Sequence, residues 1–245
     1  MAIEVFNRYE HKYLLNKSQF KNVVGIIEKH MEKDAHNIGD NPYTISNIYY
    51  DTPDDYLIRT SLSKPIYKEK LRLRSYGIPC LESEVFLEIK KKFKGIVNKR
   101  RTTLKLHEAY SFLSSGVPPE PKAYMNTQVL REIEYFLKIY NLSPKLYLAY
   151  DRIAYFEKEN KDLRISFDMN IRSRRHDLRL ESGDSGEKII SDDIFIMEVK
   201  TSLAKPLWVT AMLSDFAINR RSFSKYGTEY KNYVKEVDYI YSEVN

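Results

Sequence analysis

The chain has 245 residues, of which 42% are hydrophobic, so it is long enough to bury a core, and this excludes a disordered polymer. Its 40 Lys and Arg outnumber its 34 Asp and Glu, and the net charge of +6 favours an anionic partner over an apolar one. The mean hydropathy of −0.53, without a long apolar run, excludes a membrane-spanning helix.

The single cysteine, Cys80, excludes an internal disulfide and is typical of a reducing compartment. The first residues lack the charged start, apolar middle and cleavage site of a secretory signal. We therefore expect a cytoplasmic location, where a membrane-bound protein partner could tether the chain. The composition fits one domain over residues 1–245.

The first part of the chain contains short runs that alternate between apolar and polar residues, the pattern of half-buried strands. In chain order we expect a strand over Ala2–Leu15, a helix over Lys17–Glu32, a strand over Tyr43–Asp51, a short helix near Asp54–Ser61, and strands over Lys64–Ser75, Glu84–Lys92 and Gly95–Thr103. A hairpin turn is expected at Phe93–Gly95.

The second part of the chain begins with helices and then returns to strands. We expect helices over Leu106–Ser114 and Thr127–Tyr140, strands over Lys145–Phe156, Asp162–Asn170 and Asp193–Lys200, a flexible loop over Glu181–Lys188, and a mainly helical tail from Leu207. The helical block at about 106–141 is expected to be an insertion beside the sheet, and the C-terminal helical segment to span about 207–242. About eight strands are enough to close into a barrel.

Charge and strand alternation coincide at Lys70, Arg72 and Arg74, which share one face of a strand because side chains alternate with a period of two. The same alternation recurs in several other segments, at Lys90, Lys99, Arg101, Arg152, Arg164 and Lys200. If these strands closed into a barrel, its interior would be lined with cations that repel one another unless carboxylates or a bound polyanion neutralised them. A phosphate chain suits this role, because Arg presents a planar fork and Lys a movable charge to phosphate oxygens.

Three carboxylates each lie two residues before a lysine, at Glu10, Glu88 and Glu198. Each carboxylate therefore shares a strand face with its lysine. Two interpretations remain open from this spacing. The carboxylates form salt bridges across the interior, or they coordinate Mg²⁺ or Mn²⁺, which take oxygen ligands and bridge phosphates.

Taken in order, these segments resemble the VTC domain, the polyphosphate-polymerising branch of the triphosphate tunnel (CYTH-like) superfamily. The resemblance covers most of the chain and is based on Arg8–Tyr13, Ser46–Asp51, Lys70–Tyr76, Leu87–Lys90, Val97–Arg101, Tyr150–Tyr155, Arg164–Asp168, Met197–Thr201 and Ser222–Tyr226. It implies an α+β fold in which an eight-stranded antiparallel barrel forms a tunnel with helices packed outside. It also implies transfer of the terminal phosphate of ATP onto inorganic polyphosphate, with pyrophosphate or triphosphate as related ligands and Mn²⁺ or Mg²⁺ as cofactor.

By position, the resemblance also assigns roles to individual residues. The expected substrate-binding residues are Lys12, Arg72, Arg74, Lys90, Lys99, Arg101, Arg152, Arg164, Lys200, Arg221 and Lys225. Within this set Arg72, Arg74, Lys90, Arg152 and Lys200 are the expected catalytic residues, and the expected metal ligands are Glu198, Glu88 and Glu10.

The chain departs from the family pattern at two places. Many relatives carry Glu-x-Glu-x-Lys near the start, whereas this chain has Arg8, Glu10 and Lys12, an exchange that favours the polymerase over the hydrolases. Near the end, Ser222 stands where polymerases of this type have a basic residue, and the sequence leaves open whether Arg221 replaces it.

Other functions and sites remain open from the sequence. A tripolyphosphatase or nucleoside triphosphatase of the same fold, and a non-catalytic protein that binds polyphosphate or an inositol phosphate, are the alternatives. A nucleic-acid partner is not expected, because no familiar RNA or DNA module is present. Strand tyrosines could stack on a nucleotide base, and an arginine cluster at Arg172, Arg174, Arg175 and Arg179 could extend the basic path or form a solvated loop face.

Overall fold

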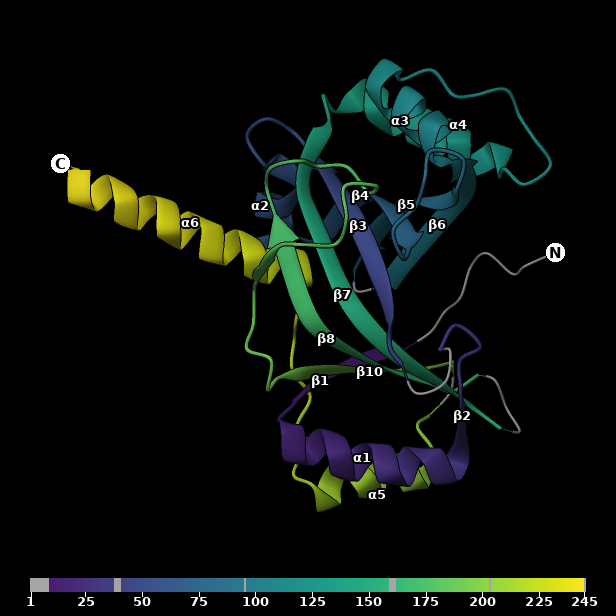
Figure 1. The fold of residues 1–245 in the computed structure, drawn as a ribbon, viewed down its shortest axis with the longest axis vertical. Coiled ribbons are helices and arrows are strands. Elements are labelled where there is room, and N and C mark those ends of the chain that lie inside the picture. The colour runs from purple at the N-terminus through teal and green to yellow at the C-terminus, as the bar shows by residue number, and fades with distance from the viewer. Residues whose placement is uncertain (1–8, 38–40, 95, 159–161, 203, 245) are drawn as a thin grey trace.

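The computed structural model describes residues 9–37, 41–94, 96–158, 162–202 and 204–244, and side chains as far as residue 236. Its centre is one curled antiparallel sheet (Figure 1). The long strands follow the order β1 (Tyr9–Leu15), β10 (Phe195–Thr201), β8 (Arg164–Arg174), β7 (Ser143–Glu157), β3 (Tyr43–Asp51), β4 (Tyr67–Tyr76), β5 (Glu84–Phe93) and β6 (Ile96–Lys105). The short strands β2 (Met31–Lys33) and β9 (Glu187–Lys188) pair with β7 and β8.

The predicted α+β fold with eight antiparallel strands is confirmed, and the curled sheet forms a half-barrel. Within the described residues the pairing ends at β1 and β6, so these two strands are not hydrogen-bonded to each other. The free edge of β1 is partly covered by the chain that follows α5. Tyr13 pairs there with Arg220, and the Arg221 N–H donates to the Lys12 carbonyl at 2.8 Å.

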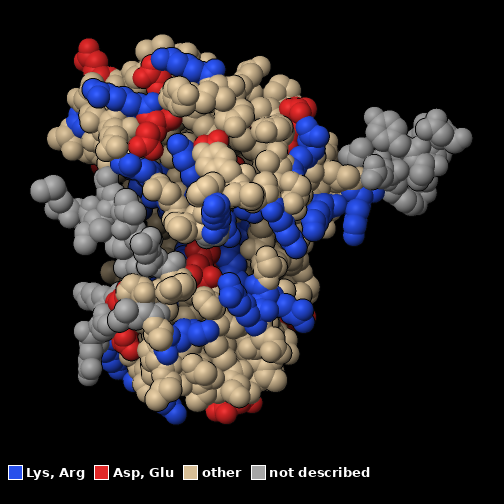
Figure 2. Space-filling model, turned by 180° about the vertical axis from the view of Figure 1, so that it is seen from behind, with Lys and Arg blue, Asp and Glu red and all other residues tan. Residues whose placement is uncertain are grey.

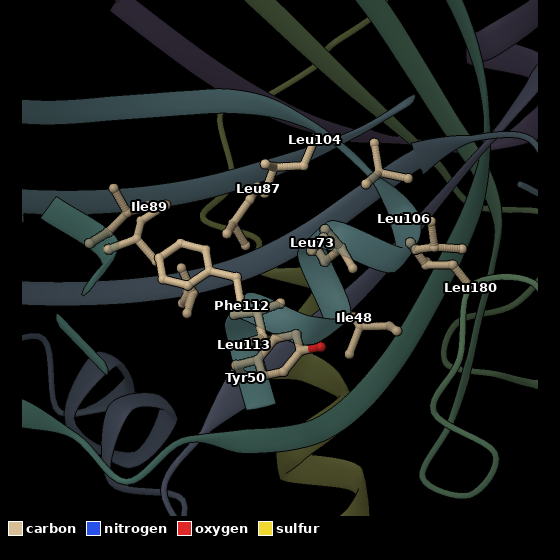
Figure 3. Close-up of a cluster of buried hydrophobic side chains, with 14 of the residues drawn as sticks. Ile48, Tyr50, Leu73, Leu87, Ile89, Leu104, Leu106, Phe112, Leu113 and Leu180 are labelled. Atoms are coloured by element: carbon tan, nitrogen blue, oxygen red, sulfur yellow. The ribbon is translucent and has the colours of Figure 1, made fainter. Parts of the chain in front are cut away.

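Helices α3 (Leu106–Ser115) and α4 (Thr127–Ile139) cover the convex face of β3 to β6 (Figure 1). Apolar residues at alternate positions of these strands, such as Leu73, Leu87 and Ile89, pack with Phe112 in one buried cluster (Figure 3). The apolar side chains of each strand pack into this cluster on the convex side. The polar side chains that alternate with them along the strand therefore face the concave side.

Helices α1 (Lys17–His30) and α5 (Leu207–Asp215) pack together beneath β1 and β10 (Figure 1). The Asn16 side chain accepts from the Gln19 N–H at 2.9 Å, and the Gln19 side chain accepts from the Asn16 N–H, which fixes the start of α1. Val23 and Ile27 bury the apolar face of α1 against β1, β8 and β10.

Helix α6 (Lys225–Val244) begins beside the concave face and then extends away from the body (Figure 1). The Tyr226 hydroxyl donates to Asp51 at 3.2 Å, and its ring centroid lies 4.7 Å from that of Tyr49. Together with Ile58 of α2 (Tyr56–Leu62) and several residues of β3 and β7, Tyr226 forms a buried apolar cluster at one end of the concave face. The first turn of α6 therefore contacts the sheet, and the rest of the helix extends outside it.

The observed elements follow the predicted order, with differences at the boundaries. The predicted helix over Lys17–Glu32 ends at His30, because Met31–Lys33 leaves the helix to pair with β7. The predicted loop over Glu181–Lys188 contains β9 at its end. The first part of the strand predicted over Ala2–Leu15, and Gly95 at the predicted hairpin, lie outside the described residues. No helix in the described part of the chain combines the length and apolar content that a bilayer crossing needs.

Candidate polyanion-binding site

The strand register brings most of the predicted site residues together on the concave face. Lys12 of β1 is opposite Glu198 of β10, and Glu10 is opposite Lys200. On the other side of the curl, Tyr49, Arg72, Glu88 and Arg101 form one cross-strand row over β3 to β6. The next row contains Lys70, Lys90 and Lys99.

Glu198 is the anionic centre of the β1 and β10 side of the site. Its carboxylate lies 3.1 Å from Lys12 Nζ and 3.0 Å from Lys200 Nζ, and 3.9 Å from both Arg152 and Lys225. Burial by itself would raise the pKa of Glu198, but the surrounding cations outweigh it and hold the pKa well below its usual range. The carboxylate therefore stays ionised, and the cations around it are positioned by the same contacts.

Asp168 of β8 forms a second centre that the sequence analysis did not single out. It accepts two hydrogen bonds from Arg152, at 2.6 and 2.8 Å, and one from Lys225 Nζ at 2.5 Å. Burial would raise the pKa of Asp168, but Arg152 and Lys225 lower it below its ordinary value. The sequence signal that could have identified Asp168 was its position in the alternating segment Arg164–Asp168. In the structure, the strand register then puts Asp168 opposite Arg152.

Glu88 of β5 neutralises the cations of the β4 to β6 side. Its carboxylate lies 2.6 Å from Arg72 Nε, 2.5 Å from Lys99 Nζ and 3.9 Å from Arg74 Nε. Arg74 also donates to Asn47 Oδ1 at 2.9 Å and to the Tyr150 hydroxyl at 3.1 Å. These contacts hold both guanidinium groups in fixed orientations on the concave face.

Lys70 of this row was not assigned a role from the sequence, whereas Lys90 was. Lys70 and Lys90 are opposite each other on β4 and β5, and neither has a carboxylate within ion-pair distance among the described residues. Burial, with repulsion from Lys90 and Lys68, lowers the pKa of Lys70 to about 8, and burial together with neighbouring cations also lowers the pKa of Lys90. Its alternation with Arg72 had placed Lys70 on the cationic face, but no role was assigned to it.

Three of the predicted substrate-binding residues have side chains with contacts outside these clusters, although Arg164 and Arg101 are opposite Lys200 and Glu88 in the strand register. Arg164 pairs with Asp34 at 3.2 Å, and the Arg101 guanidinium lies 4.8 Å from the Phe86 ring centroid. Arg221 is exposed and lines a surface depression with Leu14. A role for Arg221 in place of the basic residue missing at position 222 stays a prediction.

The arginine cluster of β8 and the loop after it is neutralised by local partners. Arg172 lies 3.1 Å from Asp151, and Arg175 donates to both carboxylate oxygens of Glu229. Arg174 donates to main-chain carbonyls of the loop that leads to β9. These contacts support the loop and the start of α6 more than they extend the concave cationic surface.

The surface that these residues form is hollowed and mainly basic. Figure 2 shows Lys and Arg side chains around a hollow at the middle of one face, with acidic side chains deep inside it. The cations of the clusters are Lys12, Lys70, Arg72, Arg74, Lys90, Lys99, Arg152, Lys200 and Lys225, and the carboxylates are Glu10, Glu88, Asp168 and Glu198. Because cations exceed carboxylates, the hollow retains positive charge that a polyanion can neutralise.

Two carboxylates that could contribute to a metal site lie near each other, those of Glu10 and Glu198. Across the described ranges, no three His, Cys, Asp or Glu side chains lie close enough to hold a metal ion by themselves. Glu10 and Glu198 share Lys12, at 3.5 and 3.1 Å, and Glu10 is the more exposed of the two carboxylates. A pair of carboxylates fits Mg²⁺ or Mn²⁺ only when phosphate oxygens and water complete the coordination. The predicted metal role of Glu88 stays a prediction.

Comparisons with known proteins give the same fold. No curated protein matches the chain. It is similar to the solved structure of a candidate adenylate cyclase from Bacillus halodurans, with 18% identity, a TM-score of 0.52, and coverage of 91% of this chain and 96% of that chain. It is also similar to a candidate adenylyl cyclase from Hippeastrum with a dominant triphosphatase activity, at 13% identity, a TM-score of 0.53, and coverage of 91% and 95%. The model of the VTC domain matches residues 7–234, and this chain therefore belongs to the VTC domain family.

Proposed function

We propose that the protein is a polyphosphate polymerase that binds ATP and a polyphosphate chain on the concave face of its sheet. The observation that carries this proposal is the pair of cations Lys70 and Lys90, which have no carboxylate partner in the described part of the chain, next to the Arg72–Glu88 cluster. Unpaired cations in a partly buried hollow are costly, and an anionic ligand removes that cost. Phosphate groups match this surface because they present several charged oxygens in a row.

The geometry supports phosphoryl transfer by positioning and charge neutralisation. Arg72 and Arg74 are held by Glu88, Asn47 and Tyr150, so their N–H groups are oriented before a ligand binds. Such fixed donors stabilise charge that develops on the transferred phosphoryl group without reorganising. The acceptor of a polymerase is a phosphate oxygen that is already ionised, so no general base is needed.

Lys12, Lys200, Arg152 and Lys225 act from the other side of the hollow. Their contacts with Glu198 and Asp168 hold them in place, and Lys12 Nζ also donates to the Phe223 carbonyl at 3.2 Å. We assign these cations to binding the chain whose end accepts the phosphoryl group. Glu198 and Glu10 would hold Mn²⁺ or Mg²⁺ together with substrate oxygens, and the bound ion would neutralise charge on the phosphates.

A triphosphatase is the second candidate, because the Hippeastrum relative is described as having a dominant triphosphatase activity. Hydrolysis needs a positioned water, and Glu10 is the carboxylate of the Glu198 cluster with enough exposure to orient one, since its side chain is 35% exposed. The two functions share the hollow and differ in the acceptor that reaches it.

Incubation of the purified protein with ATP and Mn²⁺, followed by sizing of the phosphate product, tests the proposal. Long phosphate chains are expected from a polymerase. Orthophosphate as the only product would show that the protein is a triphosphatase instead. Tight binding of tripolyphosphate by calorimetry without any turnover would instead identify a non-catalytic binding protein.

A further inference from the structure

A group of exposed apolar side chains lies where β4 begins and where β5 turns into β6. Phe93 is opposite both Tyr67 and Ile96, and the Lys94 N–H donates to the Ile66 carbonyl at 2.9 Å, so the segments are neighbours. The side chains of Ile66 and Ile96 are 66% and 65% exposed, and that of Phe93 is 52% exposed. We call Ile66, Tyr67, Phe93 and Ile96 the hairpin tip. Tyr67, Phe93 and Ile96 share one face in the strand register and Ile66 adjoins them in the chain, and exposed apolar residues gathered in this way mark a contact surface, unlike scattered exposed side chains.

Lysines surround the hairpin tip. Lys64 and Lys68 precede and follow Ile66 and Tyr67, while Lys92 and Lys94 flank Phe93. None of these four lysines has a carboxylate within ion-pair distance in the described ranges of the chain. Burial, followed by repulsion from Lys92 and Lys64, lowers the pKa of Lys68, so these ammonium groups are close enough to interact.

The geometry points to docking of the hairpin tip on an anionic lipid surface. Exposed apolar side chains can enter the boundary between headgroups and acyl chains, and lysines beside them then meet lipid phosphates. A lipid surface accounts for both features at once, because its headgroups carry the phosphates and its acyl boundary receives apolar side chains. Docking in this way brings the Lys70–Lys90 end of the concave face near the lipid, because Lys68 and Lys92 form the adjacent cross-strand pair.

Sedimentation with vesicles tests the docking directly. The full chain is expected to bind vesicles of equal parts phosphatidylcholine and phosphatidylglycerol, and not vesicles of phosphatidylcholine alone. Ile66→Ser, Phe93→Ser and Ile96→Ser together are expected to lower partitioning more than about tenfold, because each removes exposed apolar area. Lys64→Gln and Lys94→Gln are expected to lower it about fivefold for each lysine.

A matched variant controls for the loss of exposed apolar surface. Val117, Tyr135 and Leu207 are at least as exposed as the tip residues and lie on other elements. Their joint replacement by Ser is expected to leave vesicle binding unchanged. Equal loss in both triple variants would overturn the inference, as would equal binding to neutral vesicles.

Insertion of the hairpin tip has its own readout, because the chain has a single tryptophan, Trp208. In a Trp208→Phe background, Phe93→Trp is expected to shift its emission to shorter wavelength on anionic vesicles and to be quenched by brominated lipid. Tyr135→Trp in the same background is expected to do neither. An unchanged Phe93→Trp spectrum on vesicles that bind the protein would show that another surface makes the contact.

Two further measurements distinguish lipid binding by the hairpin tip from lipid binding by the basic hollow and from self-association of the chain. Arg72→Ala with Arg74→Ala is expected to retain vesicle binding, and saturating tripolyphosphate is expected not to release the protein. Release by tripolyphosphate would assign the lipid contact to the hollow and overturn the inference. Failure to bind any vesicle, with a concentration-dependent dimer that the triple tip variant abolishes, would assign the tip to a second copy of this chain.

Discussion

Arg152 and Asp168 face each other from adjacent strands and form a two-point ion pair, with Nε 2.6 Å from Oδ1 and Nη2 2.8 Å from Oδ2. Asp168 is fully buried and Arg152 nearly so. The second carboxylate oxygen also accepts from Lys225 at the start of α6. One side chain of β8 thus fixes cations that come from β7 and from the last helix, and the arrangement of the site depends on it.

Asp168→Asn is expected to destabilise the protein by about 3–5 kcal/mol, because it leaves Arg152 and Lys225 buried without their carboxylate. Chemical denaturation measures this loss. Asp192→Asn, which removes an exposed partner of Lys188, is expected to change stability by less than about 1 kcal/mol. Tripolyphosphate is expected to raise the melting temperature of Asp168→Asn more than that of the unaltered protein. Equal stability of the two variants would contradict the role of Asp168.

Arg72→Ala with Arg74→Ala is expected to weaken tripolyphosphate binding about a hundredfold or more, since each guanidinium contributes charge-assisted hydrogen bonds. Calorimetry measures the affinity, with Lys138→Ala and Lys188→Ala as a control for lost surface charge. The double variant also leaves Glu88 with Lys99 as its remaining close cation, so stability is expected to fall. Adding Glu88→Gln is expected to recover stability without recovering binding. Unchanged affinity in the double variant would remove the proposed site.

Glu198→Gln is expected to abolish Mn²⁺-dependent turnover while substrate binding is retained, because it removes the proposed metal ligand and keeps the cations Lys12 and Lys200 available to bind phosphate. Separate measurements of kcat and KM over a range of Mn²⁺ concentrations test this. Glu229→Gln is a suitable control, because Glu229 is also buried and paired with an arginine outside the hollow. Full activity of Glu198→Gln at ordinary Mn²⁺ would exclude the metal role.

Lys70 predicts a pH dependence of ligand binding. Its pKa of about 8 lies below the ordinary value of lysine, so it is charged in the folded protein only below that pH. Affinity for tripolyphosphate is expected to fall as pH rises through 8. Stability of the ligand-free protein is expected to rise over the same window toward pH 10, because the unfolded state binds the proton more tightly. Lys70→Met is expected to flatten both profiles, and a profile that Lys70→Met leaves unchanged would contradict this origin.

The sequence predicted the elements and the cationic strand faces because both follow from local periodicity. Leu71 and Leu73 had to face a core, so Arg72 and Arg74 had to face the other side. The same periodicity could not give the partner of each cation, since pairing depends on strand order. Asp168 was therefore not recognised, although its own strand was.

The contacts of two predicted residues, Arg164 and Arg221, could not be derived from local alternation. Arg164 lies on a predicted strand, but it is near the strand end, where Asp34 from a distant loop takes its guanidinium group. Arg221 is beside β1, where its N–H donates to the Lys12 carbonyl and its side chain lines a surface depression with Leu14. These placements depend on the loop after β2 and on how the chain returns after α5, which no local pattern encodes.

That return of the chain along β1 has a consequence for how the site is assembled during synthesis. Lys12 Nζ donates to the carbonyl of Phe223, a contact between positions 211 residues apart. Contacts of such long range form late, after shorter loops have closed. A ribosome must therefore have synthesised Phe223 before Lys12 can make this contact, and a growing chain shorter than that cannot present the finished set of cations to cellular polyanions.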